Sequence, residues 1–478
     1  MTEHPPKRHG DMSLFLVAFI ATVIIVGIHS LQFSHEIREP DEAAYAYIGE
    51  SVRLGEALYS EVWDNKPPGI YLTYAVGLTL TPNSMSGVRI LQYLAIFGII
   101  LSMLILVRRK TEMNPILVGF WSIFFFTFKV MEPYATLTEI FCLFFITIGV
   151  TIALCSTHKI KNILAGIAFG LSLFFSHLGI IPILVFLVLS QNKTLLGWFL
   201  ATSGVLLVGT QFIWPSFLNF YIGTGVEYLQ SWAEDPTRWD RIIKLSFLLL
   251  PPIIGGIFFG IHKIHKLDQI SLFLIGWIMG GIASIITTQS FFPHHFLILA
   301  APLILLFSIG THSLFVNRKQ WINIFFISLF LLIYLLSTVF FHWYGTETRD
   351  LVVAEEVRKI VQQEEDLWVV GYMPEIYWYS HRRNHLPFFH TLILIDHRMN
   401  PIRPELMPRV QSYFDAFPPK YVVLQSPVFI THPDLDSLLC HYAPIKENWL
   451  FQRVEKEVTE PRACESHTII NEKIRDMI

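Results

Sequence analysis

Long apolar runs separated by short polar stretches dominate the chain as far as residue 341. The first run, 12–33, follows Lys7 and Arg8, lacks a small-residue cleavage site and is about as long as a bilayer is thick. We therefore expect a retained membrane span rather than a removed signal peptide. Runs of similar length predict about eleven spans in all. The further runs are 85–107, 114–131, 136–156, 162–176, 178–191, 195–215, 242–261, 270–289, 296–315 and 321–341.

Two segments depart from this simple pattern of spans. The stretch 162–190 is too long for one straight crossing, and 176–179 and Pro182 interrupt it, which predicts two short helices. The segment 67–80 is short and begins with two prolines. We interpret it as a helix at the membrane interface rather than a span.

Basic clusters between the apolar runs all fall on one side if the N-terminus is cytoplasmic, as the positive-inside rule requires. They lie at 108–110, 159–161, 193, 263–266 and 318–319. The first loop, 34–83, and the turns near Glu132 and at 291–295 then face outward. We therefore expect a multi-pass protein of the cell membrane, with its candidate chemistry on the extracytoplasmic side.

The chain after the last run is polar and, at about 135 residues, long enough for a small external domain. Its pattern predicts a helix near 355–363 and buried strands at Leu367–Val370 and Tyr421–Leu424. The predicted fold class is mainly α, a polytopic membrane protein with a small extracytoplasmic α/β C-terminal domain. The predicted domains are 1–341, a transmembrane domain whose first external loop (34–83) carries the chemistry, and 342–478.

Composition supports this class: 53% of the residues are hydrophobic, 15% are charged, and the net charge is −3. That balance excludes an ordinary soluble domain, and the absence of a basic block argues against nucleic acid as a partner. Of the four cysteines, Cys142 and Cys155 lie in an apolar run, where packing is their ordinary role. Cys440 and Cys464 lie in the external part and could form a disulfide there.

An acidic pair stands where the first span meets water. The segment 38–45 (REPDEAAY) contains Asp41 and Glu42, and the segment 63–69 (WDNKPPG) follows in the same loop. Acids at a membrane edge are costly to dehydrate, so the pair indicates a functional site. A solvated pair at the start of a helix is the alternative.

The motifs at 40–42 (PDE) and 65–69 (NKPPG), with Arg89 opening the next span, resemble the GT-C type of lipid-linked-sugar glycosyltransferases. The resemblance is to the clan of protein O-mannosyltransferases and aminoarabinose transferases (ArnT-like). It implies inverting transfer of a sugar from a polyprenyl-phosphate donor to an acceptor on the outer face. The implied partners are the bilayer, the polyprenyl-phosphate-linked sugar, and a glycan, protein or lipid acceptor. Weaker similarities lie at 138–139, 295–302, 374–377 and 380–382.

The resemblance assigns Asp41 the role of catalytic base. A polyprenyl phosphate leaves as a stable anion, so one carboxylate that accepts the proton of the acceptor hydroxyl can suffice. Glu42 projects about 100° away from Asp41 on a helix and cannot share that task. We expect Glu42 to orient neighbouring groups instead.

Five basic or imidazole side chains are candidates for the donor phosphate. Lys66 and Arg89 could each bind it, although both could equally anchor the chain at the membrane edge. His177 stands where relatives carry a lysine, and with an ordinary pKa of about 6.5 it is only partly charged at neutral pH. A packed or interfacial histidine is its alternative role. His294 and His295 complete the set.

A second acid is expected near the base. The resemblance favours Glu139, because Thr138 precedes it, although Glu132 is available nearby. His294 and His295 with such acids could hold a divalent metal, for which three or four converging ligands are needed. A divalent metal is the one cofactor that these residues suggest.

The external tail offers Tyr377 and Arg382 as contacts for donor or acceptor. An aromatic core and a solvated basic turn are their alternatives. A transporter or lipid flippase is the main rival function, because broken helices and membrane-edge charges also occur in carriers. Against it stand the acids and histidines gathered on one face and the lack of an internal repeat. A non-catalytic scaffold is a third interpretation.

Overall fold

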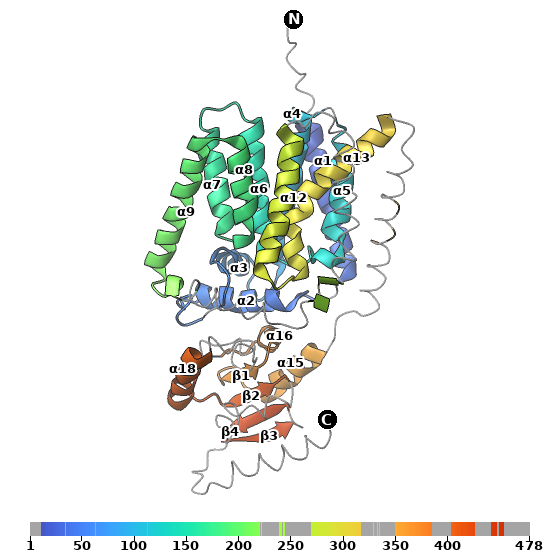
Figure 1. Ribbon diagram of the computed structural model, residues 1–478. Helices are drawn as coiled ribbons and strands as arrows, with labels where there is room; N and C mark the ends of the chain where they lie inside the picture. Colours follow the sequence, from blue (N-terminus) through green and yellow to red (C-terminus); the bar gives the residue numbers. More distant parts are fainter. Residues whose placement is uncertain are drawn as a thin grey trace, which may run out of the picture.

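The computed structural model consists of a bundle of helices and, beyond one end of the bundle, a small four-stranded sheet (Figure 1). The described residues are 11–219 except 34, 63 and 112, then 221, 239–240, 242–243, 269–316, 328, 332, 334, 349–384, 403–425, 441–446 and 449–453.

The apolar runs form the helices of the bundle, because a backbone in lipid must satisfy its hydrogen bonds internally. Five helical segments of the described chain are long and apolar enough to cross a membrane: α1, α4, α6, α9 and Pro293–His312. The bundle helices are α1 (Asp11–Gln32), α4 (Ser86–Lys110), α5 (Ile116–Thr127), α6 (Thr138–Cys155), α7 (Lys161–Leu173), α8 (Ile180–Ser190), α9 (Lys193–Ile213), α12 (Gln269–Thr288) and α13 (Ala300–Val316).

The predicted break in the stretch 162–190 is confirmed. Helix α7 ends at Leu173, α8 begins at Ile180, and the 3-10 turn η3 (His177–Gly179) lies between them. The predicted spans 242–261 and 321–341 lie largely outside the described residues. The total of about eleven spans therefore stays a prediction.

Helix α2 (Pro40–Arg53) lies across the ends of the bundle helices, facing the C-terminal sheet (Figure 1). It begins at Pro40, whose fixed backbone suits the first position of a helix. The side chain of Glu39 caps it by accepting a 2.7 Å hydrogen bond from the backbone N–H of Asp41. Helix α3 (Gly69–Leu80) follows with 12 residues, too few for a full crossing.

The C-terminal unit is a small α/β structure, as predicted. Its sheet has the order β1-β2-β4-β3, with β1 and β2 parallel and the other pairs antiparallel. Both predicted strands are confirmed at their predicted bounds, whereas β3 and β4 were not predicted. The elements are α15 (Arg349–Ile360), β1 (Leu367–Val370), α16 (Glu375–Ser380), α18 (Arg403–Ala416), β2 (Tyr421–Leu424), β3 (Tyr442–Lys446) and β4 (Leu450–Arg453).

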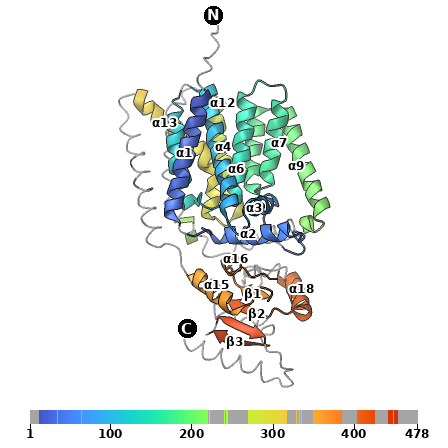
Figure 2. The ribbon, with the colours of Figure 1, turned by 180° about the vertical axis from the view of Figure 1, so that it is seen from behind.

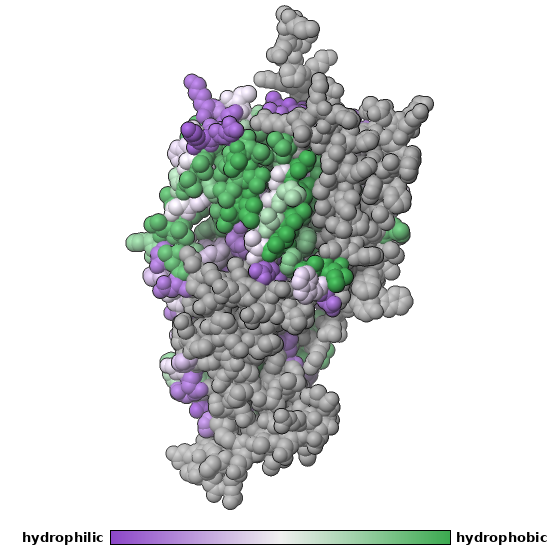
Figure 3. All heavy atoms as spheres, viewed as in Figure 1, coloured by the Kyte–Doolittle hydropathy of each residue, from purple (hydrophilic) through white to green (hydrophobic). Residues whose placement is uncertain are grey.

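The view from behind shows the same arrangement, with α15 and α16 lying between α2 and the sheet (Figure 2). In Figure 3, apolar side chains cover most of the coloured part of the helical bundle, and hydrophilic ones gather at both of its ends. The predicted division at 341–342 falls outside the described residues, as do Cys440 and Cys464. Cys142 and Cys155 are free thiols in α6.

Candidate active site

Asp41 lies in the first turn of α2, where this helix meets the C-terminal unit. Its carboxylate is half-buried and accepts hydrogen bonds from two tyrosines. Tyr45, one turn later on α2, donates to Oδ2 over 3.5 Å. Tyr372, which follows strand β1, donates to Oδ1. The predicted base thus lies between the helical bundle and the C-terminal unit.

Glu42 points away from Asp41 and into the bundle, where its side chain is fully buried. Both of its oxygens pair with the guanidinium of Arg89 on α4, with a 2.7 Å bond from Nη2 to Oε2. The backbone N–H of Arg38 donates to Oε2 over 2.8 Å, and that of Thr136 donates to Oε1. The pair ties together α2, α4 and the segment before α6.

The surroundings of Arg89 differ from those expected of a phosphate-binding residue or of an anchor at the membrane edge. Its guanidinium also donates to the Glu36 carbonyl and to Thr136 Oγ1, both over 2.8 Å. These partners engage it inside the protein, where its side chain is buried. The sequence did not reveal this because the contacting residues are far apart along the chain.

Lys66 is half-buried in a turn that tyrosine hydroxyls hold. Tyr59 donates to the Lys66 carbonyl over 2.9 Å, and the Lys66 N–H donates to Tyr71 Oη over 3.3 Å. Tyr71 in turn donates to Asp64 Oδ2 over 3.0 Å. Asp64 is thus a second carboxylate of the loop, which the sequence reasoning quoted within a motif but did not select.

Gly69 explains why the NKPPG motif ends in glycine. Its N–H donates to the Phe174 carbonyl over 2.9 Å, and a Cβ here would lie 2.5 Å from that oxygen. This close approach brings the loop against Phe174, at the end of α7. As a result Lys66 interacts electrostatically with His177, which is exposed, and with His295, which is buried.

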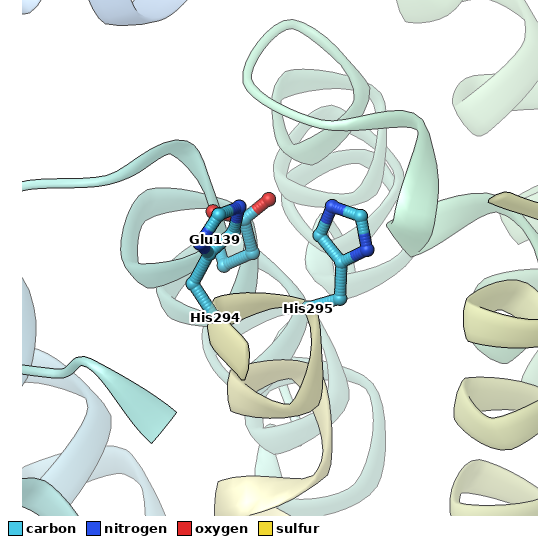
Figure 4. A group of neighbouring side chains, drawn as sticks. All are labelled: Glu139, His294 and His295. Carbon is cyan, nitrogen blue, oxygen red and sulfur yellow. The ribbon is translucent and has the colours of Figure 1, made fainter. Parts of the chain in front are cut away.

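Glu139, His294 and His295 form a buried cluster at the start of α6 and in η5 (Pro293–Leu299) (Figure 4). One ligand atom of each lies within 4.8 Å of the others. Glu139 Oε2 is buried and has no hydrogen-bond partner among the described residues. A carboxylate and two imidazoles that converge in this way suit a divalent cation such as zinc.

Both acids considered in the sequence contribute at this place. Glu132 Oε2 lies 2.9 Å from His294 Nδ1, while Glu139 joins the cluster itself. Thr288 Oγ1 lies 3.3 Å from His295 Nδ1. These contacts orient the two rings, as outer partners of metal-binding histidines do.

Carboxyl groups gather around the N-terminus of α2. Burial raises the pKa of Glu39 well above its usual range, and the neighbouring Asp41, Glu132 and Glu42 raise it further. Burial and the charge of Asp41 also raise the pKa of Tyr372 well above its usual range. Tyr372 is therefore protonated at neutral pH and acts as the donor in its bond to Asp41.

Tyr377 and Arg382 lie in the C-terminal unit, but their side chains are engaged inside it or against α2. Tyr377 Oη accepts a 2.8 Å bond from the Val369 N–H, and its ring packs on Tyr47 at 5.0 Å between centroids. Arg382 donates from Nε to the Val361 carbonyl over 2.8 Å. Neither makes a described contact with the residues around Asp41. Tyr372 does make such a contact, but no motif in the sequence indicated it.

Comparisons with known proteins bear on the fold. No family model and no curated protein matches this chain. The crystal structure of ArnT from Cupriavidus metallidurans bound to undecaprenyl phosphate is similar, with a TM-score of 0.57 and 14% identity over 95% of this chain and 100% of that chain. The apo structure of the same protein has the same TM-score and identity, over 91% and 96%. The chain therefore has the ArnT-like GT-C fold that its motifs resemble.

Proposed function

We propose that this protein is a membrane glycosyltransferase that transfers a sugar from a polyprenyl-phosphate donor to an acceptor. The observation that carries the proposal is the position of Asp41, a half-buried carboxylate that interacts electrostatically with His294 of the histidine cluster, in an ArnT-like fold. One of the similar structures has undecaprenyl phosphate bound, which supports a polyprenyl phosphate as the lipid part of the donor. The acceptor is a protein, a lipid or an envelope glycan.

Asp41 acts as the base in the proposed reaction. The acceptor oxygen bonds to the anomeric carbon from the face opposite the phosphate, and the bond from that carbon to the phosphate oxygen breaks. The acceptor proton passes to Asp41, and polyprenyl phosphate leaves as an anion. The configuration at the anomeric carbon is inverted.

Lys66, His177 and His295 serve the leaving phosphate in this proposal. Lys66 offers a point charge, and its electrostatic interaction with the two imidazoles supports a shared position for the three side chains. The buried pair of Glu42 and Arg89 has a different role, because it fixes the helix that carries Asp41. We assign it positioning rather than contact with substrate.

Glu139, His294 and His295 would hold a divalent cation in this proposal. When bound, such a cation supplies positive charge that can stabilise an anionic oxygen. Thr288 and Glu132 would orient the two rings through their hydrogen bonds. The catalytic residues proposed are thus Asp41 as base, with Glu139 as a metal ligand.

The decisive experiment compares the purified wild-type protein with Asp41→Asn on short-chain polyprenyl-phosphate sugars and a panel of acceptors. Loss of a general base typically costs about 10²- to 10⁴-fold in rate, so we expect transfer to fall by at least about a hundredfold. Asp415→Asn, an exposed aspartate on α18, is the matched control and keeps full activity. Equal thermal unfolding of all three proteins shows that folding is unchanged.

Two results would count against the proposal. Full transfer by Asp41→Asn would remove Asp41 from the role of base. No transfer from any donor, together with movement of the lipid between leaflets of reconstituted vesicles, would favour the flippase instead.

A further inference from the structure

Tyr372 is held rigidly by the sheet of the C-terminal unit. It follows Gly371, whose φ of 125° is one that residues with a side chain rarely adopt. The Tyr372 N–H donates to Gln425 Oε1 over 2.9 Å, just beyond the end of β2. Since β1 and β2 pair in parallel beside it, the sheet fixes the direction in which the ring extends.

Separate contacts hold this unit against α2. Tyr47 Oη donates to the Asn384 carbonyl over 2.8 Å. Arg383 donates to Ser51 Oγ over 2.7 Å and to Glu56. The hydroxyl of Tyr372 is therefore delivered to Asp41 by a docked unit and not by a single loop.

A third docking contact makes a useful comparison. Tyr379, on α16, accepts a 3.1 Å hydrogen bond from the Ile37 N–H. It joins the same two parts of the molecule as Tyr372 does, yet no described contact links it to Asp41. The two tyrosines thus separate docking of the unit from contact with the base.

The bond from Tyr372 to Asp41 has the same kind of donor and the same acceptor as the proposed reaction. A hydroxyl donates to Oδ1 of the proposed base, as an acceptor hydroxyl must before it loses its proton. The second oxygen, Oδ2, faces Tyr45. An acceptor hydroxyl that takes this place on Oδ1 displaces that of Tyr372.

We infer that Tyr372 is a positioning residue that occupies the acceptor's place on Asp41 until an acceptor hydroxyl displaces it. The inference rests on the proposed function. Its consequence is selectivity against water, because a water molecule that donated to Oδ1 could attack the donor in the acceptor's place. Hydrolysis would place the water oxygen on the anomeric carbon, give the proton to Asp41 and release polyprenyl phosphate.

The test is Tyr372→Phe, which keeps the ring and removes the hydroxyl. The probes are a short-chain polyprenyl-phosphate mannose and the matching arabinose, each supplied first in water alone and then with the acceptor panel. A hydrogen bond to a charged group is strong enough that its loss should raise donor hydrolysis about tenfold. We expect the KM for acceptor to fall by a similar factor while kcat changes less than about threefold.

Tyr379→Phe is the matched control, because it removes a docking hydrogen bond without touching Asp41. It should keep the wild-type ratio of hydrolysis to transfer. The double variant Asp41→Asn with Tyr372→Phe should lose the added hydrolysis, since the base is then absent. Thermal unfolding of each variant identifies any loss of folding.

The outcomes separate this inference from the proposed function. If the wild-type protein transfers sugar but Tyr372→Phe has the hydrolysis ratio of Tyr379→Phe, the inference is overturned and the function stands. A fall in kcat with no added hydrolysis would also overturn it, as this would mean that Tyr372 assists the reaction. If the wild-type protein neither transfers nor hydrolyses any donor, both the proposed function and the inference that rests on it are wrong.

Discussion

Glu139 carries a buried carboxylate oxygen that has no hydrogen-bond partner among the described residues. An ionised oxygen in that position is costly unless a positive group compensates it. A ligand atom of His294 and one of His295 lie within 4.8 Å of the Glu139 carboxylate. This arrangement suits three ligands of one metal ion better than hydrogen bonds from the two imidazoles to the carboxylate. A cation bound by all three would satisfy the oxygen and give both rings a function.

We predict that the purified protein binds zinc and that Glu139→Gln weakens this binding by at least about tenfold. The amide is a poorer ligand than the carboxylate because it carries no charge. Affinity should also fall as the pH is lowered, because imidazole must be neutral to bind a metal. Metal analysis and zinc titration measure both effects without relying on activity.

Glu61→Gln is the control for this prediction. Glu61 is an exposed acid whose described hydrogen bond lies within its own turn and not in the cluster. It should bind zinc as the wild-type protein does. Equal zinc affinity in Glu139→Gln and the wild type would show that the three side chains do not form a metal site.

The sequence revealed single site residues better than it revealed their partners. Asp41 and Glu42 were found in a motif, and the helical period correctly separated their directions. The partner of Glu42 was not foreseen, because Arg89 lies 47 positions away. Tyr372 lies 331 positions from Asp41, and a lone tyrosine in a polar tail carries no sign of such a contact.

Helices α3 and α4 pack closely enough to exclude side chains at their crossing. A Cβ on Gly77 would lie 2.6 Å from Val88 Cγ2, and one on Gly87 would collide with the Gly77 carbonyl. The Gly87 N–H also donates to Thr81 Oγ1 over 2.7 Å. Because α4 carries Arg89, this crossing helps to place the ion pair beneath Asp41.

We predict that Gly87→Ala lowers the free energy of unfolding by about 1 to 3 kcal/mol, the usual cost of forcing extra volume into a packed contact. Gly197→Ala on α9 is the control, because no atom of the described residues lies within 4 Å of the added methyl. The control should be neutral or stabilising by up to about 1 kcal/mol. Thermal unfolding in detergent compares the two. A neutral Gly87→Ala would show that the crossing can adjust.

Among the strands, the local sequence pattern was sufficient to predict those that are buried along their whole length. The strands Leu367–Val370 and Tyr421–Leu424 are buried at every position, and their apolar runs gave their bounds correctly. Strand β3 (Tyr442–Lys446) was missed because it is mostly exposed and contains Pro444. Its pairing with β4 also carries a register irregularity, which no local pattern indicates.

The proposed site and the basic clusters at 108–110 and 159–161 lie at opposite ends of the bundle. Helix α4 begins near the site and ends in the basic residues Arg108, Arg109 and Lys110. Lys159 lies in the exposed turn that follows α6, and Glu139 lies in the first turn of the same helix. The charge pattern therefore places the site on the extracytoplasmic side, as a proposal from the positive-inside rule.

We predict that a cysteine replacing Glu61, in a cysteine-free background, reacts with an impermeant maleimide on intact cells. A cysteine replacing Lys159 should react only after the cells are permeabilised. Both positions are exposed, so they are matched in accessibility. Labelling of the Lys159 position on intact cells, with protection of the Glu61 position, would show that the orientation is opposite to the proposed one.

Parallel pairing of β1 with β2 also sets an order of events during synthesis. Strand β1 cannot find its neighbour until the chain through Leu424 has been made, because β2 comes later in the sequence. Membrane helices and domains form from the N-terminus onward. Asp41 is thus made well before the sheet that brings Tyr372 to it can form. Until the chain through Leu424 has been made, the Asp41 carboxylate lacks the hydrogen bond from Tyr372.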